Sequence, residues 1–328
     1  MLIYIARRLA MAASVVLATL IATFFLFFAG PADPALAMCA ENRCPESKLA
    51  DIRHSMGLDR PVPEQFAEYF KGIFVGREIT DGGNTIHCSA PCLGYSFHSH
   101  QEVKSLVMSK MPTTITLALM TMVIFLAIGI TSGVFASQRR GTAVDRVVVG
   151  FSQVFGSIPY YIVALLFSLY LTVLYPVLPK AASMTDGVGP WLIGMLAPAL
   201  ILGLVYATTY VRYTRAQMVE ALNQDYVRTA RSKGISESTV TYRHALRAAL
   251  SPVITILGLD MAGLFSGTLV TEQIFELDGV GRLSIRSLGL DDLPIIMGTV
   301  VMTAVIVVTM NLLVDIAYSV IDPRVRLS

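Results

Sequence analysis

The sequence predicts an all-α integral membrane protein with six transmembrane helices and a large extracytoplasmic loop after the first. Of its 328 residues 54% are hydrophobic and 15% charged, and the mean hydropathy is +0.64, which excludes an ordinary soluble domain. Six apolar stretches are long enough to cross a bilayer, which takes about 17 to 25 residues. Because none alternates like a barrel strand, and lipid offers backbone groups no partner, we expect helices. The predicted spans cover residues 9–30, 111–136, 147–175, 190–211, 248–271 and 294–320.

The first apolar stretch could be a cleavable signal peptide or a retained helix. It is longer than the core of a typical signal peptide, and the residues from Pro31 to Pro34 that follow it make a poor cleavage site. We therefore expect residues 1–30 to remain as the first transmembrane helix. The rest of the chain then divides into an extracytoplasmic segment, 31–110, and a core that holds five further spans, 111–328.

The charges at the ends of the spans predict the orientation in the membrane. If the N-terminus is cytoplasmic, 14 of the 25 Lys and Arg residues lie on the cytoplasmic side, and most of the others lie in one long outer segment, where the positive-inside rule is weak. The acidic residues favour the outer side. We therefore expect both termini in the cytoplasm.

The outer segment 31–110 contains all four cysteines of the chain: Cys39, Cys44, Cys88 and Cys92. An even number of cysteines on the exported side of a membrane indicates disulfides, and four cysteines allow three pairings. Free thiols are an alternative. A metal site shared with the histidines of this segment is another, but the spacing matches no zinc pattern.

A basic, polar stretch at 212–252 separates the fourth and fifth spans and is a candidate docking surface on the cytoplasmic side. Its pattern predicts one helix over 217–233, a turn at Gly234, and a second helix that Ser236 caps and that continues through Leu250. The alternative is that its basic residues only satisfy the positive-inside rule. The first helix has an apolar stripe that enters either a partner's groove or the chain's own core: Met218, Ala221, Leu222, Tyr226 and Ala230.

Two segments of this stretch carry a recognisable pattern, Asp225-Tyr-Val-Arg-Thr-Ala-Arg-Ser-Lys-Gly234 and His244-Ala-Leu-Arg-Ala-Ala-Leu-Ser-Pro252. They resemble the cytoplasmic EAA loop of ABC-importer permeases, and more narrowly the B-type inner-membrane subunit of the dipeptide/oligopeptide permease family. Further matches to that family follow in the same order along the chain: Ala6–Leu9, Gly30–Ala35, Leu58–Pro61, Pro112–Thr114, Ser157–Tyr160, Phe275–Leu283 and Asn311–Arg324.

The chain also departs from the family pattern. Residues 228–230 are Arg-Thr-Ala where the general EAA pattern has Glu-Ala-Ala, a feature that the peptide branch shares. The cysteine-bearing segments, about 38–46 and 78–92, resemble insertions, and Asp260 stands where an uncharged polar residue is expected.

The resemblance implies the type I ABC importer permease fold and a multi-pass subunit of the bacterial cytoplasmic membrane. Such a subunit imports peptides or peptide-like solutes by alternating access. It implies as partners a homologous second permease, two ATPase subunits that bind ATP and Mg, an extracytoplasmic substrate-binding protein and membrane lipid, with no nucleic acid. Relatives also carry haem, metal chelates or glutathione. It assigns ATPase coupling to Asp225, Arg228, Thr229, Ala230, Lys233, Gly234 and Ser236.

The chain itself is expected to be non-catalytic and to hold no cofactor or metal. It has no Gly-x-x-x-x-Gly-Lys-Ser/Thr loop to cradle ATP phosphates, so the ATPase is expected on another chain. The resemblance also makes the acidic segment 271–292 an external loop on which the binding protein lands; a solvated loop is the alternative.

Two carboxylates within the spans, Asp260 and Asp315, invite a functional interpretation because a charge in lipid is costly. Asp260 either binds substrate in the pathway or makes a hydrogen bond between helices, and the latter is favoured for Asp315. Tyr160 and Tyr161, after Pro159, form either a pathway wall or part of an ordinary proline kink.

Two rival functions use the same residues. One is a proton-coupled secondary transporter that uses Asp260 and Asp315. The other is a membrane sensor whose cysteine-rich outer loop binds a ligand.

Overall fold

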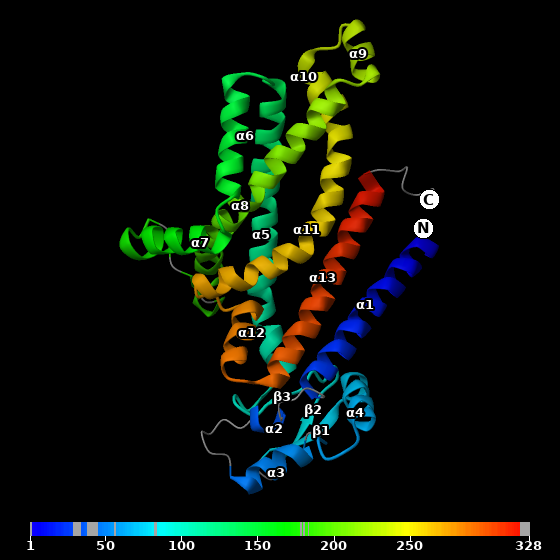
Figure 1. Ribbon diagram of the computed structural model, residues 1–328, viewed down its shortest axis with the longest axis vertical. Coiled ribbons are helices and arrows are strands. Elements are labelled where there is room, and N and C mark those ends of the chain that lie inside the picture. The colour runs from blue at the N-terminus through cyan, green and yellow to red at the C-terminus, as the bar shows by residue number, and fades with distance from the viewer. Residues whose placement is uncertain are drawn as a thin grey trace. The chain divides into compact units, whose positions relative to one another are not determined.

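A computed structural model describes residues 2–28, 34–37, 45–55, 57–81, 84–177, 179, 181–182 and 184–321. The fold is mostly helical (Figure 1). It divides into two compact units. Unit 1 comprises Met1–Thr114 and Asp278–Thr309, and unit 2 comprises Ile115–Leu277 and Met310–Ser328. Two long helices contribute residues to both units, α5 (Val103–Gln138) and α13 (Leu293–Ile321).

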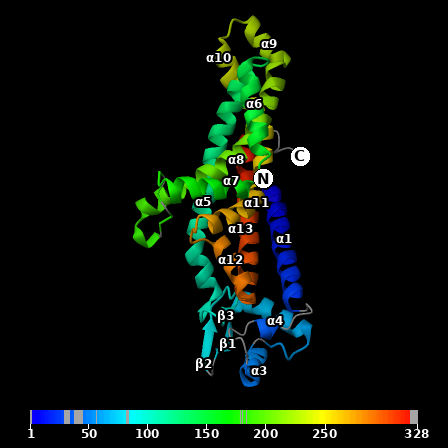
Figure 2. The ribbon, with the colours of Figure 1, turned by 60° about the vertical axis from the view of Figure 1, so that its left-hand side comes forward.

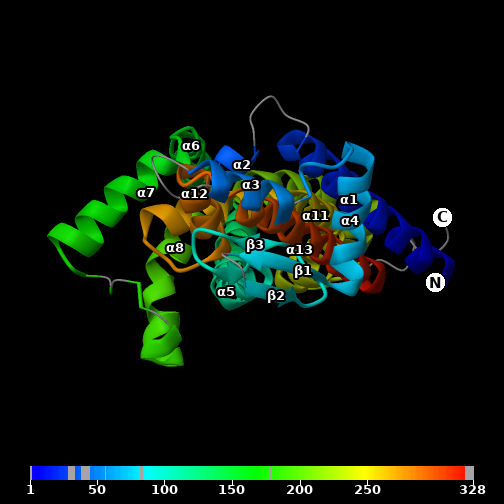
Figure 3. The same ribbon diagram turned by 90° about the horizontal axis from the view of Figure 1, so that it is seen from below.

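Unit 1 shows that the described part of the predicted outer loop is folded. Its first antiparallel hairpin pairs Arg77 with Cys88, and its second pairs Tyr95 with Glu102; the first hairpin is seen beside α4 in Figure 3. The elements are α1 (Leu2–Phe28), α2 (Pro34–Ala37), α3 (Glu46–Ser55), α4 (Val62–Val75), β1 (Arg77–Asp81), β2 (Asn84–Cys88), β3 (Tyr95–Ser96), β4 (Gln101–Glu102) and α12 (Val280–Gly289).

The core of unit 1 explains why this segment folds. Phe24 of α1 is fully buried and meets Tyr69 of α4 with ring centroids 5.8 Å apart, beside Met297 of α13. The apolar face of α4 therefore packs against α1, and the burial of this face stabilises the folded segment. A solvated loop would have no such contact.

One predicted disulfide is present. Cys88 and Cys92 are bonded, and both side chains are fully buried beside Ile79 and Tyr95. The disulfide interpretation is confirmed for this pair, while Cys39 and Cys44 lie outside the described residues. The segment 78–92, which resembles an insertion, thus supplies the β1–β2 hairpin and its cross-link.

The segment predicted as an external loop, 271–292, is largely helical. Within unit 1 it holds α12, whose first residue Val280 donates its backbone N–H to the hydroxyl of Thr114 at 2.9 Å. Asp292, 2% exposed, accepts hydrogen bonds from the hydroxyl of Ser96 and from the backbone N–H of Ile295. This end of the segment is therefore a packed element and not a solvated loop.

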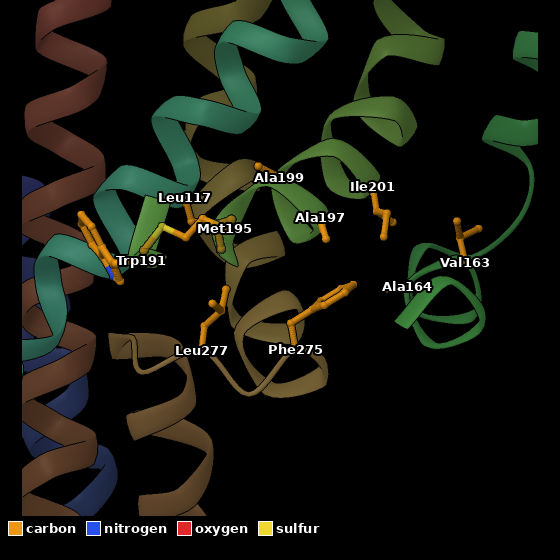
Figure 4. Packing of buried hydrophobic residues seen from close by; sticks show 10 residues of the cluster. All are labelled: Leu117, Val163, Ala164, Trp191, Met195, Ala197, Ala199, Ile201, Phe275 and Leu277. Carbon is orange, nitrogen blue, oxygen red and sulfur yellow. The ribbon is translucent and has the colours of Figure 1, made fainter. Parts of the chain in front are cut away.

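Unit 2 is a helical bundle with a large apolar cluster between its helices. Figure 4 shows this cluster, in which Leu117 of α5, Trp191 and Met195 of α8, and Phe275 and Leu277 after α11 pack together. The elements besides α5 are α6 (Ala143–Gly156), α7 (Tyr160–Ser168), π-helix η1 (Leu169–Leu174), 3₁₀-helix η2 (Met184–Asp186), α8 (Val188–Leu222), α9 (Asp225–Ser232), α10 (Glu237–Thr239), π-helix η3 (Val240–Ala245) and α11 (Leu246–Ile274).

Four helices in the described residues are long and apolar enough to cross a membrane, in Ala6–Phe27, Val103–Gln138, Val188–Leu222 and Leu293–Val314. They confirm the predicted first, second, fourth and sixth spans as helices. The third and fifth predicted spans are bent pairs, so the count reaches six only if each pair is one span.

The third predicted span is interrupted by much more than an ordinary kink. Ala143–Gly156 and Tyr160–Leu174 meet at 90°, and Figure 2 shows α7 projecting sideways from the other helices of unit 2. The alternative of an ordinary proline kink within 147–175 was therefore wrong, because the bend is 90°. Because Pro159 lacks an N–H and is preceded by Ser157 and Ile158 outside any helix, it starts a new helix.

The fifth predicted span is longer than expected and also bent. Glu237–Gly258 and Gly263–Ile274 meet at 52°, and the helical stretch extends well before residue 248.

Candidate coupling surface and intramembrane polar groups

The predicted helix over 217–233 is two helices. The long helix α8 ends at Leu222, and α9 begins at Asp225. Between them Gln224 has an extended backbone with φ −74° and ψ 154°, which ends the run of helical hydrogen bonds. The expectation of one helix was wrong, because Asn223 is a weak helix former and Asp225 suits the first turn of a new helix.

The predicted turn at Gly234 is confirmed in detail. Gly234 has φ +74°, and its N–H donates to Arg231 O at 2.9 Å while the Ile235 N–H donates to Ala230 O at 3.3 Å. These two bonds form a Schellman motif, which favours glycine at the left-handed position. Ala230 and Ile235 pack together in a small apolar cluster with Val227, as that motif usually requires.

The predicted cap at Ser236 differs from the expectation. Ser236 is extended and precedes the next helix, but within the described chain its hydroxyl caps no backbone N–H and instead meets the hydroxyl of Thr239 at 3.0 Å. The helix that follows does not end at Leu250. It runs through a π-helical segment into α11 and ends at Ile274.

Most of the apolar stripe packs against the chain itself. Met218 and Ala221 are buried against Val134 of α5 and Ala249 of α11, and Ala230 is buried as well. The interpretation that the stripe enters a partner's groove was therefore wrong for these three residues. Tyr226, 44% exposed, is the member of the stripe that faces outward.

The proposed coupling residues lie at the tip of unit 2, where α9 and α10 extend past the end of α6 (Figure 1). Arg231 makes two hydrogen bonds to Glu237 across the turn, at 2.7 and 3.2 Å, and they raise the pKa of Arg231. Both side chains are exposed, so the pair contributes about 0 to 1 kcal/mol and mainly fixes the shape of the turn. The exposed candidates are Asp225, Arg228, Thr229, Lys233, Gly234 and Ser236, while Ala230 faces inward.

A polar cavity of about 620 Å³ lies beside this turn. The end of α5, the end of α8, α9 and the start of the following helix contribute to it. Its lining consists of Ser137, Gln138, Arg140, Val219, Leu222, Asn223, Arg231, Glu237, Ser238, Thr241 and Tyr242.

A buried ion pair, which the sequence analysis missed, joins α6 to α8 just below this region. Arg215 donates two hydrogen bonds to Asp145, at 2.5 and 2.6 Å, and Asp145 also accepts the backbone N–H of Gly141 at 2.9 Å. The Asp145 side chain is 5% exposed and that of Arg215 is 27% exposed. One turn earlier on α8, Arg212 donates to the amide oxygen of Gln153 at 3.0 Å. The two contacts join α6 to the C-terminal part of α8.

Two of the side chains predicted near the pathway make hydrogen bonds to neighbouring helices. Asp260 accepts a hydrogen bond from the hydroxyl of Tyr210 at 3.0 Å, and Tyr160 meets the hydroxyl of Thr271 at 2.5 Å. Tyr161 is 54% exposed on α7. The side chain of Asp315 lies outside the described residues, and among those described no three His, Cys, Asp or Glu side chains cluster as metal ligands.

Comparisons with known proteins decide the family. The sequence model described as "Binding-protein-dependent transport system inner membrane component" matches residues 128–327, and the corresponding N-terminal model matches residues 1–118. The chain belongs to this family. It is therefore an inner-membrane permease component of a binding-protein-dependent, ABC-type transport system.

Relatives of the permease align over nearly their whole length. A probable peptide ABC transporter permease of Sinorhizobium fredii is 33% identical, over 99% of both chains. A putative peptide transport system permease of Brucella abortus is 36% identical over 98% of both, and the dipeptide transport system permease of Escherichia coli is 30% identical over 99% of both. The proton-coupled and sensor interpretations receive no support from these relatives.

Proposed function

We propose that this chain is the permease subunit of an importer for peptides or peptide-like solutes, driven by separate ATPase subunits. The observation that carries this proposal is the full-length similarity to permeases of peptide and dipeptide transport systems in several bacteria. Similarity that covers both units, and not the shared core alone, favours a common cargo class as well as a common fold.

In this proposal each bent helix pair is one span, which gives six spans with both termini in the cytoplasm. Support comes from the excess of Lys and Arg on one side of the spans. The folded segment after α1 then lies outside the cytoplasm, where the Cys88–Cys92 disulfide is chemically stable.

The tip of unit 2 is proposed as the surface that contacts the ATPase subunits, which bind ATP and Mg. A movement in soluble subunits reaches helices in lipid only through a stiff element. Here α9 is closed at its C-terminal end by the turn at Gly234, and its buried face is fixed by Val227 and Ala230. The helix α8 leads from this tip toward the membrane, and the Asp145–Arg215 pair ties its cytoplasmic part to α6.

The translocation pathway is proposed to lie between this chain and a homologous second permease, with Tyr160, Tyr161 and Asp260 near it. An extracytoplasmic binding protein would deliver the solute, and ATP-driven closure of the ATPase subunits would alternate the side to which the pathway opens. The exposure of Tyr161 on a helix that projects from unit 2 supports this placement.

The test is peptide uptake by the assembled complex. The chain is co-expressed with the second permease, ATPase subunits and binding protein encoded by neighbouring genes, and reconstituted in vesicles. We expect uptake of a labelled dipeptide that is lost when the ATPase Walker lysine is mutated. Uptake that persists in that mutant would favour proton coupling and would overturn the proposal.

The docking surface has its own test. Gly234→Pro cannot adopt φ +74° and loses the N–H that bonds Arg231 O, so the turn cannot form. We expect the ATPase to be lost from the purified complex, whereas Gly234→Asn, which tolerates the left-handed conformation, should retain it. If Gly234→Pro leaves both ATPase binding and uptake intact, the assignment of this surface is wrong.

A further inference from the structure

A second cavity, of about 390 Å³, lies within the folded segment of unit 1. The end of α3, the helix α4 and the strand β1 surround it, and the end of α1 closes one side. The lining residues are Phe24, His54, Gly57, Arg60, Gln65, Glu68, Tyr69, Lys71, Gly72, Gly76, Arg77, Glu78 and Thr80. No step of the proposed transport cycle uses this cavity.

Arg77 is a cation of this cavity whose guanidinium has no hydrogen-bonded carboxylate among the described residues. In the part of the chain that the structure describes, its side chain makes no hydrogen bond or ion pair, and its Nε is closed off from solvent. The guanidinium lies 5.5 Å from the ring centre of Tyr69, and burial lowers the pKa of Arg77. Glu68 acts on this half-buried guanidinium electrostatically but makes no hydrogen bond to it, so the donors of Arg77 are left for an anion from elsewhere.

The position of Arg77 is fixed by its neighbours. A Cβ added to Gly72 would lie 3.1 Å from Arg77 Cδ, so the absence of a side chain on that turn of α4 makes room for the arginine stem. Gly76 has φ +84°, and a Cβ there would lie 2.7 Å from Cys88 O. The disulfide-linked hairpin thereby holds β1, and with it Arg77, close to the end of α4.

Gln65 has the second polar group of this cavity that lacks a hydrogen-bond partner among the described residues. Its side chain is 8% exposed, and its Nε2 donates to the backbone oxygen of Arg60 at 2.8 Å. Its Oε1 has no hydrogen-bond partner among the described residues. Of the other cations in the lining, Arg60 is already paired with Glu68 and Lys71 is exposed to water. Arg77 is therefore the half-buried cation that can accept an anion, and Gln65 offers an amide oxygen that can accept a donor.

We propose that this cavity binds the carboxylate of a small amphoteric solute, such as an amino acid or a short peptide. The carboxylate pairs with Arg77, whose planar guanidinium suits a carboxylate, and an N–H of the solute donates to Gln65 Oε1. A cavity of this volume suits a small molecule. The proposal does not depend on what the complex transports.

The same chemistry could come from a carboxylate side chain of the binding protein, so the test separates the two sources. The probe is dialanine, and the control is its C-terminal amide, in which a neutral group of similar shape replaces the carboxylate. Binding to the assembled complex without the binding protein is measured by calorimetry. We expect dialanine to bind and its amide to bind more than tenfold more weakly, because a charge-assisted hydrogen bond is lost.

Variants then place the site. Arg77→Gln should weaken dialanine binding more than tenfold, and Arg77→Lys, which keeps the charge, should weaken it less. Arg286→Gln is the matched control, because it removes an exposed arginine of the same unit outside the cavity and should leave binding unchanged.

Three outcomes overturn the proposal. The first is no dialanine binding to the unmodified complex, and the second is equal binding of dialanine and its amide. The third is that Arg77→Gln leaves dialanine binding intact but weakens the association of the binding protein with the complex. That result would assign Arg77 to the interface with the binding protein. Peptide uptake is measured separately, so failure of this site is distinguishable from failure of the transport function.

Discussion

The buried pair of Asp145 and Arg215 allows a quantitative prediction. Replacing Arg215 with Met leaves the carboxylate of Asp145 buried, with the N–H of Gly141 as its remaining hydrogen-bond donor in the described chain. Breaking a buried ion pair costs about 3 to 5 kcal/mol. Because the Arg215 side chain is 27% exposed and partly hydrated, we expect a smaller loss than this, about 2 to 3 kcal/mol.

Removing the carboxylate of Asp145 should destabilise the protein less than removing the guanidinium of Arg215. In Asp145→Asn the remaining Arg215 can turn toward water, so we expect about 1 to 2 kcal/mol. The double variant should then be more stable than the sum of the single changes predicts, with a coupling energy of about 1 kcal/mol or more. Denaturant unfolding in detergent micelles measures these differences for the four proteins of the cycle.

Arg212→Met is the matched control. It lies on the same helix and also contacts α6, but it loses only hydrogen bonds to Gln153 and to a backbone carbonyl of its own helix. We expect a loss below about 1 kcal/mol. If Arg212→Met and Arg215→Met destabilise equally, or if Asp145 and Arg215 show no coupling, the ion pair does not join α6 to α8 as argued.

Three other predictions test the packing of unit 2. A Cβ at Gly129 would lie 2.4 Å from Tyr210 Cβ, so Gly129→Ala should lower stability by about 1 to 3 kcal/mol. Gly150 has open space around it among the described residues, so Gly150→Ala should be neutral or slightly stabilising. Thermal unfolding measures both variants. Gly234→Ala meets no atom of the described chain within 4 Å but requires φ +74°, so it should cost about 1 to 2 kcal/mol, and an unchanged melting temperature would contradict the left-handed turn. Asp260→Asn keeps an acceptor for the Tyr210 hydroxyl and should preserve stability, while Asp260→Leu should lose about 1 to 3 kcal/mol; equal stability of the two variants would contradict the hydrogen bond.

The membrane helices and the turn at Gly234 could be predicted from the sequence because their causes are local. A run of apolar residues requires a helix in lipid, and a glycine after a basic last turn favours a left-handed end. The 90° bend before Tyr160 was harder to predict. A proline within an apolar run is compatible with a kink or a break, and the packing of the neighbouring helices decides which one forms.

Two features that the sequence analysis missed share one physical reason, which is that they depend on contacts between distant parts of the chain. The stripe of Met218 and Ala221 has the same periodicity whether it meets a partner or α5 and α11. Likewise, Asp145 and Arg215 are 70 residues apart, and a sequence gives their charges but not their pairing. The composition at the break between α8 and α9 was a usable signal, since Asn, Gln and Asp follow one another there.

The closed turn after α9 has a consequence for how a partner recognises it. The hydrogen bonds of its Schellman motif and its Arg231–Glu237 ion pair are made within the chain itself. The turn is therefore already formed before a partner binds. A partner then loses little conformational entropy on this side of the interface, and association needs no prior folding step. Affinity at such a preorganised surface depends on the fit of the partner's groove, so substitutions there should change the dissociation rate more than the association rate.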